Sequence, residues 1–230
     1  MTDRPRLNPT GALAAFGRAT YSDIVSVVLL SVAFWVVSLP VVTLGPAILA
    51  LVAAMTEGVT GRTAGRKVTE RDRLRRFRQT FTGEFRRGLP LGVLLVAVVV
   101  TTLWYAQLAV STGNGALLVG TLVGLYGIVL AVVVVFRAAT LLVREGAPSA
   151  RLALWDAAKH ALSTPSFTVL QASFAALLGV ICIGLGIAVL VLLPGLLAVL
   201  EVVAYEESTG GGALRVVRAY QGELRVGGDS

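Results

Sequence analysis

Few residues in this chain of 230 are of a type that performs acid–base, nucleophilic or metal chemistry. There is one histidine, His160, and one cysteine, Cys182, so no internal disulfide and no His/Cys metal cluster can form. His160 follows Lys159 and could act as a base, but the pattern around it is not typical of a catalytic group. Cys182 lies in an apolar run and is expected to be a small buried side chain. We therefore predict no enzyme activity, no metal and no cofactor.

Two ionisable residues, Arg137 and Glu201, lie close to the interior of apolar segments that are expected to cross a membrane. Charged groups are costly in a low-dielectric interior, so such residues either mark a transport pathway or are paired with each other. A third option is that their side chains extend to the nearest polar surface. We expect a mutual pair or such an extension, because Gln107 and Gln171 are the only other long polar side chains within these stretches.

The elements that carry these residues are strongly apolar. Hydrophobic residues make up 56% of the chain and charged residues only 14%, far from the roughly 25% charged residues of a soluble domain. Three stretches contain no charged residue: 24–56, 88–136 and 161–200. A helix needs about 20 residues to cross a bilayer, so each stretch is too long for one span and suits two. The sequence thus predicts an all-α integral membrane protein with about six transmembrane helices in three hairpins.

The first hairpin is predicted from the segment SLPVVTLGP, which contains Pro40, Thr43, Gly45 and Pro46. Pro40 lacks a backbone N–H, so a helix should end near Leu39. Pro46 is suited to the first turn of the next helix, where the missing N–H would have no intrahelical partner. The alternative is one long tilted helix followed by a re-entrant segment.

The other two hairpins are placed by turn-forming residues. The segment STGNG at 111–115 predicts the second reversal, and CIGLG at 182–186 the third. The expected spans are 23–40, 46–60, 89–110, 116–140, 166–183 and 186–205, in one membrane domain. Residues 206–230 are expected to form a flexible cytoplasmic tail.

The distribution of basic residues agrees with six spans. All 20 Lys and Arg fall in the N-terminal segment, the 57–87 loop, the segment 137–159 and the C-terminal tail, while the three predicted turns contain none. With six spans all four basic segments share one side, which the positive-inside rule makes cytoplasmic. We expect a multi-pass protein of the cell membrane with both termini in the cytoplasm.

The 57–87 loop contains an amphipathic pattern in which Leu74, Phe77, Phe81 and Phe85 recur every three or four residues among arginines. This pattern is typical of a helix that lies in the headgroup plane and contacts anionic lipids, rather than nucleic acid. Shorter Leu-x-x-aromatic segments precede the other two hairpins, at Leu13/Phe16 and Leu152/Trp155. We therefore expect three units, each with an interfacial helix and a transmembrane hairpin.

Three segments carry a family resemblance: SLPVVTLGPAILAL (38–51), the basic segment with its three phenylalanines, and AAKHALSTPSFTVL (157–170). Together they resemble the YesL-like family of multi-pass membrane proteins, whose domain has no known function. Members of that family are often associated with bacterial carbohydrate uptake. The resemblance implies a link to sugar transport without defining a mechanism.

Two functions of different classes remain open. The first is a non-catalytic accessory or regulatory membrane protein whose partners include the bilayer and, by the resemblance, transporter subunits. The second is a small transporter or channel, which would need a polar path through the spans. Gly120, Gly124 and Gly127 share one helix face and allow close packing, either within the chain or in a homo-oligomer.

Overall fold

The computed structural model describes residues 9–66, 68–208, 217, 218 and 220. Within these residues all regular structure is helical, which confirms the predicted fold class. Ten α-helices and one 3₁₀ helix follow each other along the described chain: α1 Pro9–Ser22, α2 Ile24–Ser38, η1 Val41–Thr43, α3 Leu44–Thr63, α4 Glu70–Gly83, α5 Phe85–Thr112, α6 Gly115–Arg144, α7 Ala150–Ser163, α8 Pro165–Gly184, α9 Ala188–Val191 and α10 Leu193–Ser208. Of the predicted tail at 206–230, residues 206–208 belong to α10, and beyond them only 217, 218 and 220 are among the described residues.

Four helices of the described chain are long and apolar enough to cross a membrane: η1 with α3, α5, α6 and α8. A fifth span results if α1 and α2, which meet at an angle of 81°, form one broken span. These helices place the protein in a membrane, whereas the count of six spans is not confirmed. In the region of the expected sixth span the chain forms the short helix α9 and then α10, with a break at Leu192 before Pro194.

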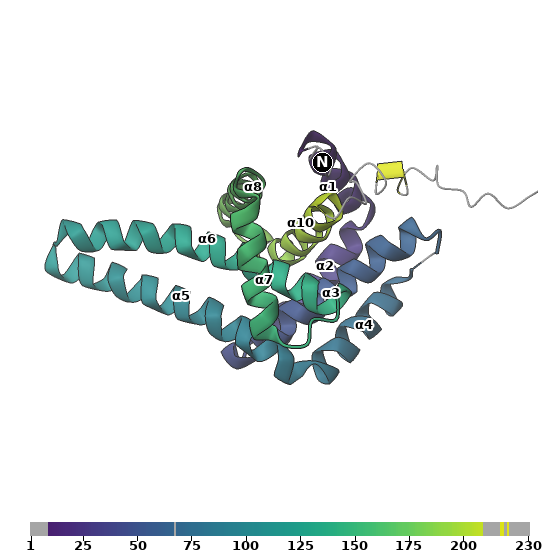
Figure 1. The fold of residues 1–230 in the computed structure, drawn as a ribbon, viewed down its shortest axis with the longest axis horizontal. Coiled ribbons are helices and arrows are strands. Elements are labelled where there is room, and N and C mark those ends of the chain that lie inside the picture. Colours follow the sequence, from purple (N-terminus) through teal and green to yellow (C-terminus); the bar gives the residue numbers. More distant parts are fainter. Residues whose placement is uncertain (1–8, 67, 209–216, 219, 221–230) are drawn as a thin grey trace, which may run out of the picture.

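Helix α3 forms the centre of the fold. In its most apolar window 72% of the residues are buried, compared with 17–22% for α5, α6 and α8. It packs against α2, α4, α5, α6 and α10. Helices α5 and α6 pair along their length and extend beyond the other helices as a long hairpin (Figure 1). The exposed apolar surface of these outer helices is what a lipid environment would cover.

The helix is interrupted between α2 and α3, at the position that Pro40 and Pro46 predicted. Helix α2 ends at Ser38, and the Thr43 hydroxyl donates a hydrogen bond to the Pro40 carbonyl oxygen at 2.6 Å. Helix α3 then begins at Leu44, with Gly45 and Pro46 in its first turn. Because backbone N–H groups of a first turn have no intrahelical partner, proline removes no hydrogen bond there.

The second and third reversals each use a glycine in the left-handed region. Gly113 has φ +64° and ends α5, and the Asn114 side chain accepts a hydrogen bond from the Ala116 N–H to start α6. After α8, Gly186 has φ +63°. Residues other than glycine rarely adopt this conformation, so the turns depend on these positions.

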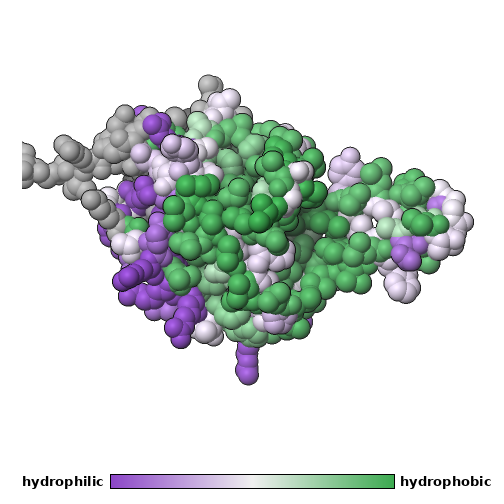
Figure 2. Space-filling model, turned by 180° about the vertical axis from the view of Figure 1, so that it is seen from behind, coloured by the Kyte–Doolittle hydropathy of each residue, from purple (hydrophilic) through white to green (hydrophobic). Residues whose placement is uncertain are grey.

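Hydrophilic and hydrophobic residues are separated on the surface, along the direction in which the α5–α6 hairpin extends. Figure 2 shows hydrophilic residues gathered on the side of the body away from the tip of the α5–α6 hairpin, with hydrophobic residues over much of the remaining surface. This separation agrees with a membrane protein whose basic elements share one side.

Candidate functional site

Arg137 and Glu201 form an ion pair inside the fold. The Nε atom of Arg137, on α6, lies 2.6 Å from Oε1 of Glu201, on α10, and their side chains are only 7% and 1% exposed. Of the interpretations that the sequence left open, the geometry therefore corresponds to a mutual pair. Neither side chain extends to the surface.

Hydrogen bonds to other side chains complete this pair. Gln171, on α8, donates through Nε2 to Glu201 Oε2 at 2.6 Å and accepts from Arg137 Nη2 at 3.5 Å. Arg137 also donates through Nη1 to the Ser208 hydroxyl at 3.0 Å. A buried pair is tolerated when its remaining donors and acceptors are satisfied in this way. We call Arg137, Gln171, Glu201 and Ser208 the α6–α8–α10 cluster.

A second layer of charges continues from this cluster toward the surface. Arg144 pairs with Glu206 at 2.5 Å, and the Tyr205 hydroxyl donates to Glu145 at 2.6 Å. The guanidinium groups of Arg137 and Arg144 lie over the Tyr205 ring, at 5.6 and 4.9 Å from its centroid. This layer contains charges of both signs, so it can hold α6 and α10 together without a large net charge.

His160 lies beside the cluster on α7. It shares with Arg137 and Gln171 the lining of a cavity of about 10 Å³, close to the minimum for one water molecule. Burial, followed by the positive charge of Arg137, lowers the pKa of the His160 imidazole below its ordinary value. A neutral imidazole is therefore favoured. Among the described residues, no group of three or more His, Cys, Asp or Glu side chains could hold a metal ion.

The structure contains a second buried charge cluster, which the sequence analysis missed. Asp23 is 5% exposed and lies 2.5 Å from Arg62 and 3.0 Å from Arg73, which is only 2% exposed. The Tyr220 hydroxyl donates to Asp23 at 2.6 Å, and the Arg62 guanidinium lies 4.6 Å from the centroid of the Tyr220 ring. We call Asp23, Arg62, Arg73 and Tyr220 the Asp23 cluster.

One signal in the sequence could have indicated the Asp23 cluster. Arg73 precedes Phe77 by four residues, so the two share a face of α4, and an arginine on an apolar helix face needs a buried anion. The partner, Asp23, stands fifty positions earlier and could not be identified without the tertiary fold. Gly58 makes room for Arg73, because a Cβ at this glycine would lie 2.6 Å from the Arg73 Cζ atom.

The start of α4 is stabilised by a capping box. The Thr69 hydroxyl accepts from the Asp72 N–H, and the Asp72 carboxylate accepts from the Thr69 N–H at 3.2 Å and from its hydroxyl at 2.7 Å. These hydrogen bonds lower the pKa of Asp72. Glu70, in the first turn, accepts a hydrogen bond from Ser26 of α2. The start of α4 is therefore linked to α2.

The four residues predicted to form a lipid-facing stripe have different surroundings, and Phe85 belongs to α5 and not to α4. Phe77 is 3% exposed in the protein core and stacks with Phe81, and Phe81 in turn contacts Phe85 edge to face. Phe81 and Phe85 are half-buried, and Leu74 is 48% exposed. The side chain of Phe77 therefore packs against protein and not against lipid, because α4 lies on the central helix α3.

Gly45 has a packing role that involves α5. A Cβ at Gly45 would lie 2.1 Å from the Gly88 carbonyl oxygen and 2.4 Å from the Gly92 nitrogen. The φ angle of Gly45 is ordinary, so close approach of two backbones explains this glycine, and the approach is to α5 and not to α2. Small residues allow such contacts between membrane helices.

Glycines of α6 pack within the same chain. A Cβ at Gly124 would lie 2.5 Å from the Thr102 hydroxyl, and one at Gly120 would lie 3.0 Å from the Tyr105 ring, both on α5. Gly127 has more space, since its nearest atom, on Val98, would be 3.8 Å away. Gly120 and Gly124 therefore allow α5 and α6 to pack closely within the hairpin.

Together, the apolar helices and the paired interior charges define an all-α membrane protein. The family described as "Protein of unknown function, DUF624" matches residues 24–107, which cover α2 to α4 and most of α5. Comparison with curated proteins and with solved structures found no match.

Proposed function

We propose that this protein is a non-catalytic accessory or regulatory component of a membrane system, in the cell membrane with both termini in the cytoplasm. The observation that carries this proposal is the pairing of its interior charges. Arg137, Glu201, Asp23 and Arg73 are all nearly inaccessible, and each has a partner of opposite charge. Groups arranged in this way hold helices together and are poorly placed to exchange ions or substrates.

The outer helices provide a surface for a membrane partner. A groove of about 510 Å³ between α6 and α8 is lined by Leu122, Leu125, Tyr126, Val129, Leu130, Val169, Ala172, Ser173 and Ala176. Its lining is almost wholly apolar, as the interface with a transmembrane helix of another subunit would be. A transporter subunit is the partner we propose, and a second copy of this chain is the alternative.

Carbohydrate uptake is the process we propose for that partner. The support is the resemblance of segments 38–51, 57–87 and 157–170 to the YesL-like family, together with the DUF624 match over 24–107. Both concern a domain without an assigned activity, so the link to sugar rests on the association of that family with uptake systems.

The direct test is capture of the tagged full chain from native membranes, followed by identification of proteins in stoichiometric amounts. An Ala172→Phe variant fills the α6–α8 groove, and Val93→Phe serves as control at an exposed α5 position outside it. We expect a transporter subunit with the wild type and the control, and its loss with Ala172→Phe. Recovery of this chain alone, in all three cases, would contradict the proposal.

A small transporter is the second candidate, and the α6–α8–α10 cluster is the observation that favours it. Buried ionisable groups next to a titratable histidine are typical of proton-coupled carriers. Purified protein in liposomes should then move solute, and Glu201→Gln should abolish that movement. The accessory proposal predicts no flux above that of empty liposomes for either form.

A further inference from the structure

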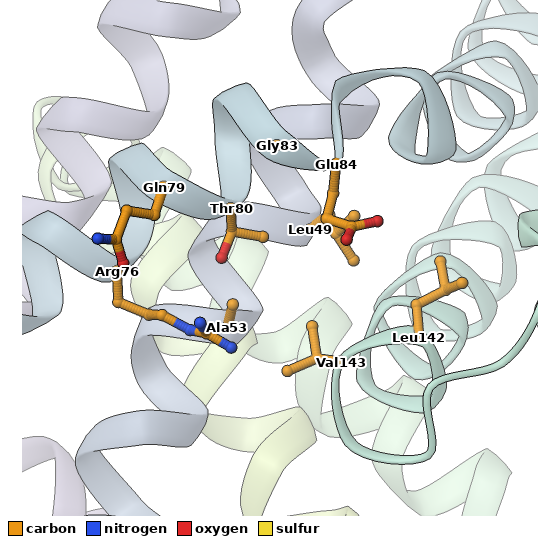
Figure 3. Close-up of a pocket in the computed structure, with 9 residues that line it drawn as sticks. All are labelled: Leu49, Ala53, Arg76, Gln79, Thr80, Gly83, Glu84, Leu142 and Val143. Carbon is orange, nitrogen blue, oxygen red and sulfur yellow. The ribbon is translucent and has the colours of Figure 1, made fainter.

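A cavity of about 190 Å³ lies between α3, α4 and α6 and is lined in part by residues of the basic 57–87 loop. This volume is far above the about 10–15 Å³ that one water molecule needs. Figure 3 shows Arg76, Gln79 and Thr80 on one wall, all from α4. The opposite walls are apolar and are formed by Leu49, Ala53, Leu142 and Val143. The cavity is thus polar on one side and apolar on the other.

The guanidinium group of Arg76 still has N–H donors that can bind an anion. Its side chain is 46% exposed, and its ion pair with Glu57 is long, with 3.7 Å between Nε and Oε2. An arginine has five N–H donors, so one distant carboxylate leaves several donors for another anion. The other charged residue of the lining, Glu84, is paired with Arg87 at 2.8 Å and contributes little net charge.

A second cavity, of about 330 Å³, adjoins the first and shares Arg76 and Gln79 with it. Its other charged residues are Arg66, Arg75, Glu57 and Asp72. Asp72 is held by Arg75 at 3.0 Å. With three arginines against two carboxylates, the second cavity has a net positive charge, and Arg76 stands where the charged and the apolar parts meet.

We infer that these joined cavities bind a phosphate ester, with its phosphate on Arg76, Gln79 and Thr80 and its carbon part against Leu49 and Val143. Arginine binds phosphate through paired, charge-assisted hydrogen bonds, and the amide and hydroxyl add donors. The headgroup of a membrane phospholipid and a small soluble phosphate ester share this chemistry. The inference does not depend on the proposed function, because it concerns the isolated chain.

The test measures binding of three probes to the purified full chain in a neutral detergent by native mass spectrometry and calorimetry. The probes are dioctanoyl phosphatidylglycerol, dioctanoylglycerol without phosphate, and glycerol 3-phosphate without acyl chains. We expect the phospholipid to bind and dioctanoylglycerol to bind at least roughly tenfold more weakly, since a hydrogen bond to a charged group contributes about 1.5–3 kcal/mol. Binding of glycerol 3-phosphate as well would identify a soluble ester as the ligand, and its failure a lipid.

Arg76→Gln should weaken binding of the phosphate-bearing probe at least roughly tenfold. The control is Arg78→Gln, which removes the same charge from an exposed position of α4 outside both cavities. One basic residue near a surface contributes about 1 kcal/mol, so the control should lose no more than about fivefold. Equal losses in the two variants would mean general attraction to the basic loop and would overturn the site.

Val143→Phe tests the apolar wall by placing a larger side chain at the cavity. It should weaken binding of the phospholipid while thermal unfolding stays close to that of the wild type. Unchanged binding in a folded Val143→Phe variant would overturn the position of the carbon part. Absence of binding by both phosphate-bearing probes to the wild type would overturn the inference as a whole.

Discussion

At the residue scale, the fold is organised around charges that have been removed from water. The Arg137–Glu201 pair and the Asp23–Arg73 pair are each only a few per cent exposed. Moving an ion into a low-dielectric interior costs several kcal/mol, and the attraction of a close partner offsets this cost only when other hydrogen bonds are made. Gln171 and Ser208 make them in one cluster, and Tyr220 makes one in the other.

Glu201→Ala should destabilise the protein by about 3–5 kcal/mol, because it leaves the Arg137 guanidinium buried without its counter-ion. The double variant Arg137→Met with Glu201→Met should cost much less, since it removes both charges and keeps the volume filled. Chemical unfolding in detergent measures both. If the double variant were as unstable as the single one, the pair would have a role other than charge compensation.

His160 should make stability fall in acid. Its pKa is lowered in the folded state by burial and by Arg137, so the unfolded state binds more protons as the pH falls below about 6.5. The contribution of His160 to stability is therefore complete above that pH and is lost as the pH falls through its folded-state pKa. His160→Gln should flatten this part of the unfolding profile. If the stability of His160→Gln depended on pH in the same way as that of the wild type, His160 would not be the group responsible.

Single residues could be predicted from the sequence only where their neighbours in the chain made them unusual. Arg137 and Glu201 were recognised as candidates because each lies close to the predicted membrane interior. Asp23 was not, because its partners Arg62 and Arg73 are separated from it by tens of residues and meet it only through the packing of α2, α3 and α4. Arg73 is one of several arginines in the same amphipathic segment, so it was not singled out from the sequence.

At the element scale, the central helix α3 determines how the others pack. Its first turn approaches the backbone of α5 at Gly45, Gly88 and Gly92. Helix α4 lies along it, so the Phe77 side of α4 belongs to the protein core. The amphipathic pattern predicted the helix correctly, but such a pattern is the same whether its apolar face meets lipid or protein.

Gly45→Val should destabilise the protein by about 1–3 kcal/mol or more, because its side chain would overlap the Gly88 carbonyl group. Pro46→Ala should be tolerated, since residue 46 lies in the first turn of α3. Gly179→Val, on α8, is the matched control, because a Cβ there meets nothing within 4 Å. The unfolding temperatures of the three variants test this prediction. Equal unfolding temperatures of Gly45→Val and Gly179→Val would exclude the close contact between α3 and α5.

Phe77→Ala should cost about 3–5 kcal/mol, as expected for a phenylalanine in a packed core. Leu74→Ala, on the same helix and 48% exposed, should cost far less. A spin label at position 74 should be accessible from the surface, whereas one at 77 should be immobile in protein. Similar costs and similar label mobility at both positions would mean that α4 lies on lipid as the sequence pattern first indicated.

At the scale of the whole molecule, composition was sufficient to predict an all-α membrane protein, and prolines and glycines were sufficient to place its turns. The number of transmembrane spans could not be predicted in the same way. Two stretches that are apolar enough by composition form short or bent elements: α9 with α10, and α1 with α2. Whether an apolar stretch forms one straight helix long enough to cross the bilayer depends on its packing against other helices, and this information is distributed over the chain.

The orientation of the α5–α6 hairpin tests the membrane architecture most directly. In a Cys182-free background, a single cysteine at Ser111 or Asn114, both exposed, should react with a membrane-impermeant reagent added outside intact cells. A cysteine at Thr82, exposed in the 57–87 loop, should react only after the membrane is permeabilised. This result is predicted because the turn carries no basic residue and the loop carries ten. Labelling of Thr82→Cys from outside, or protection of both turn positions, would contradict the architecture.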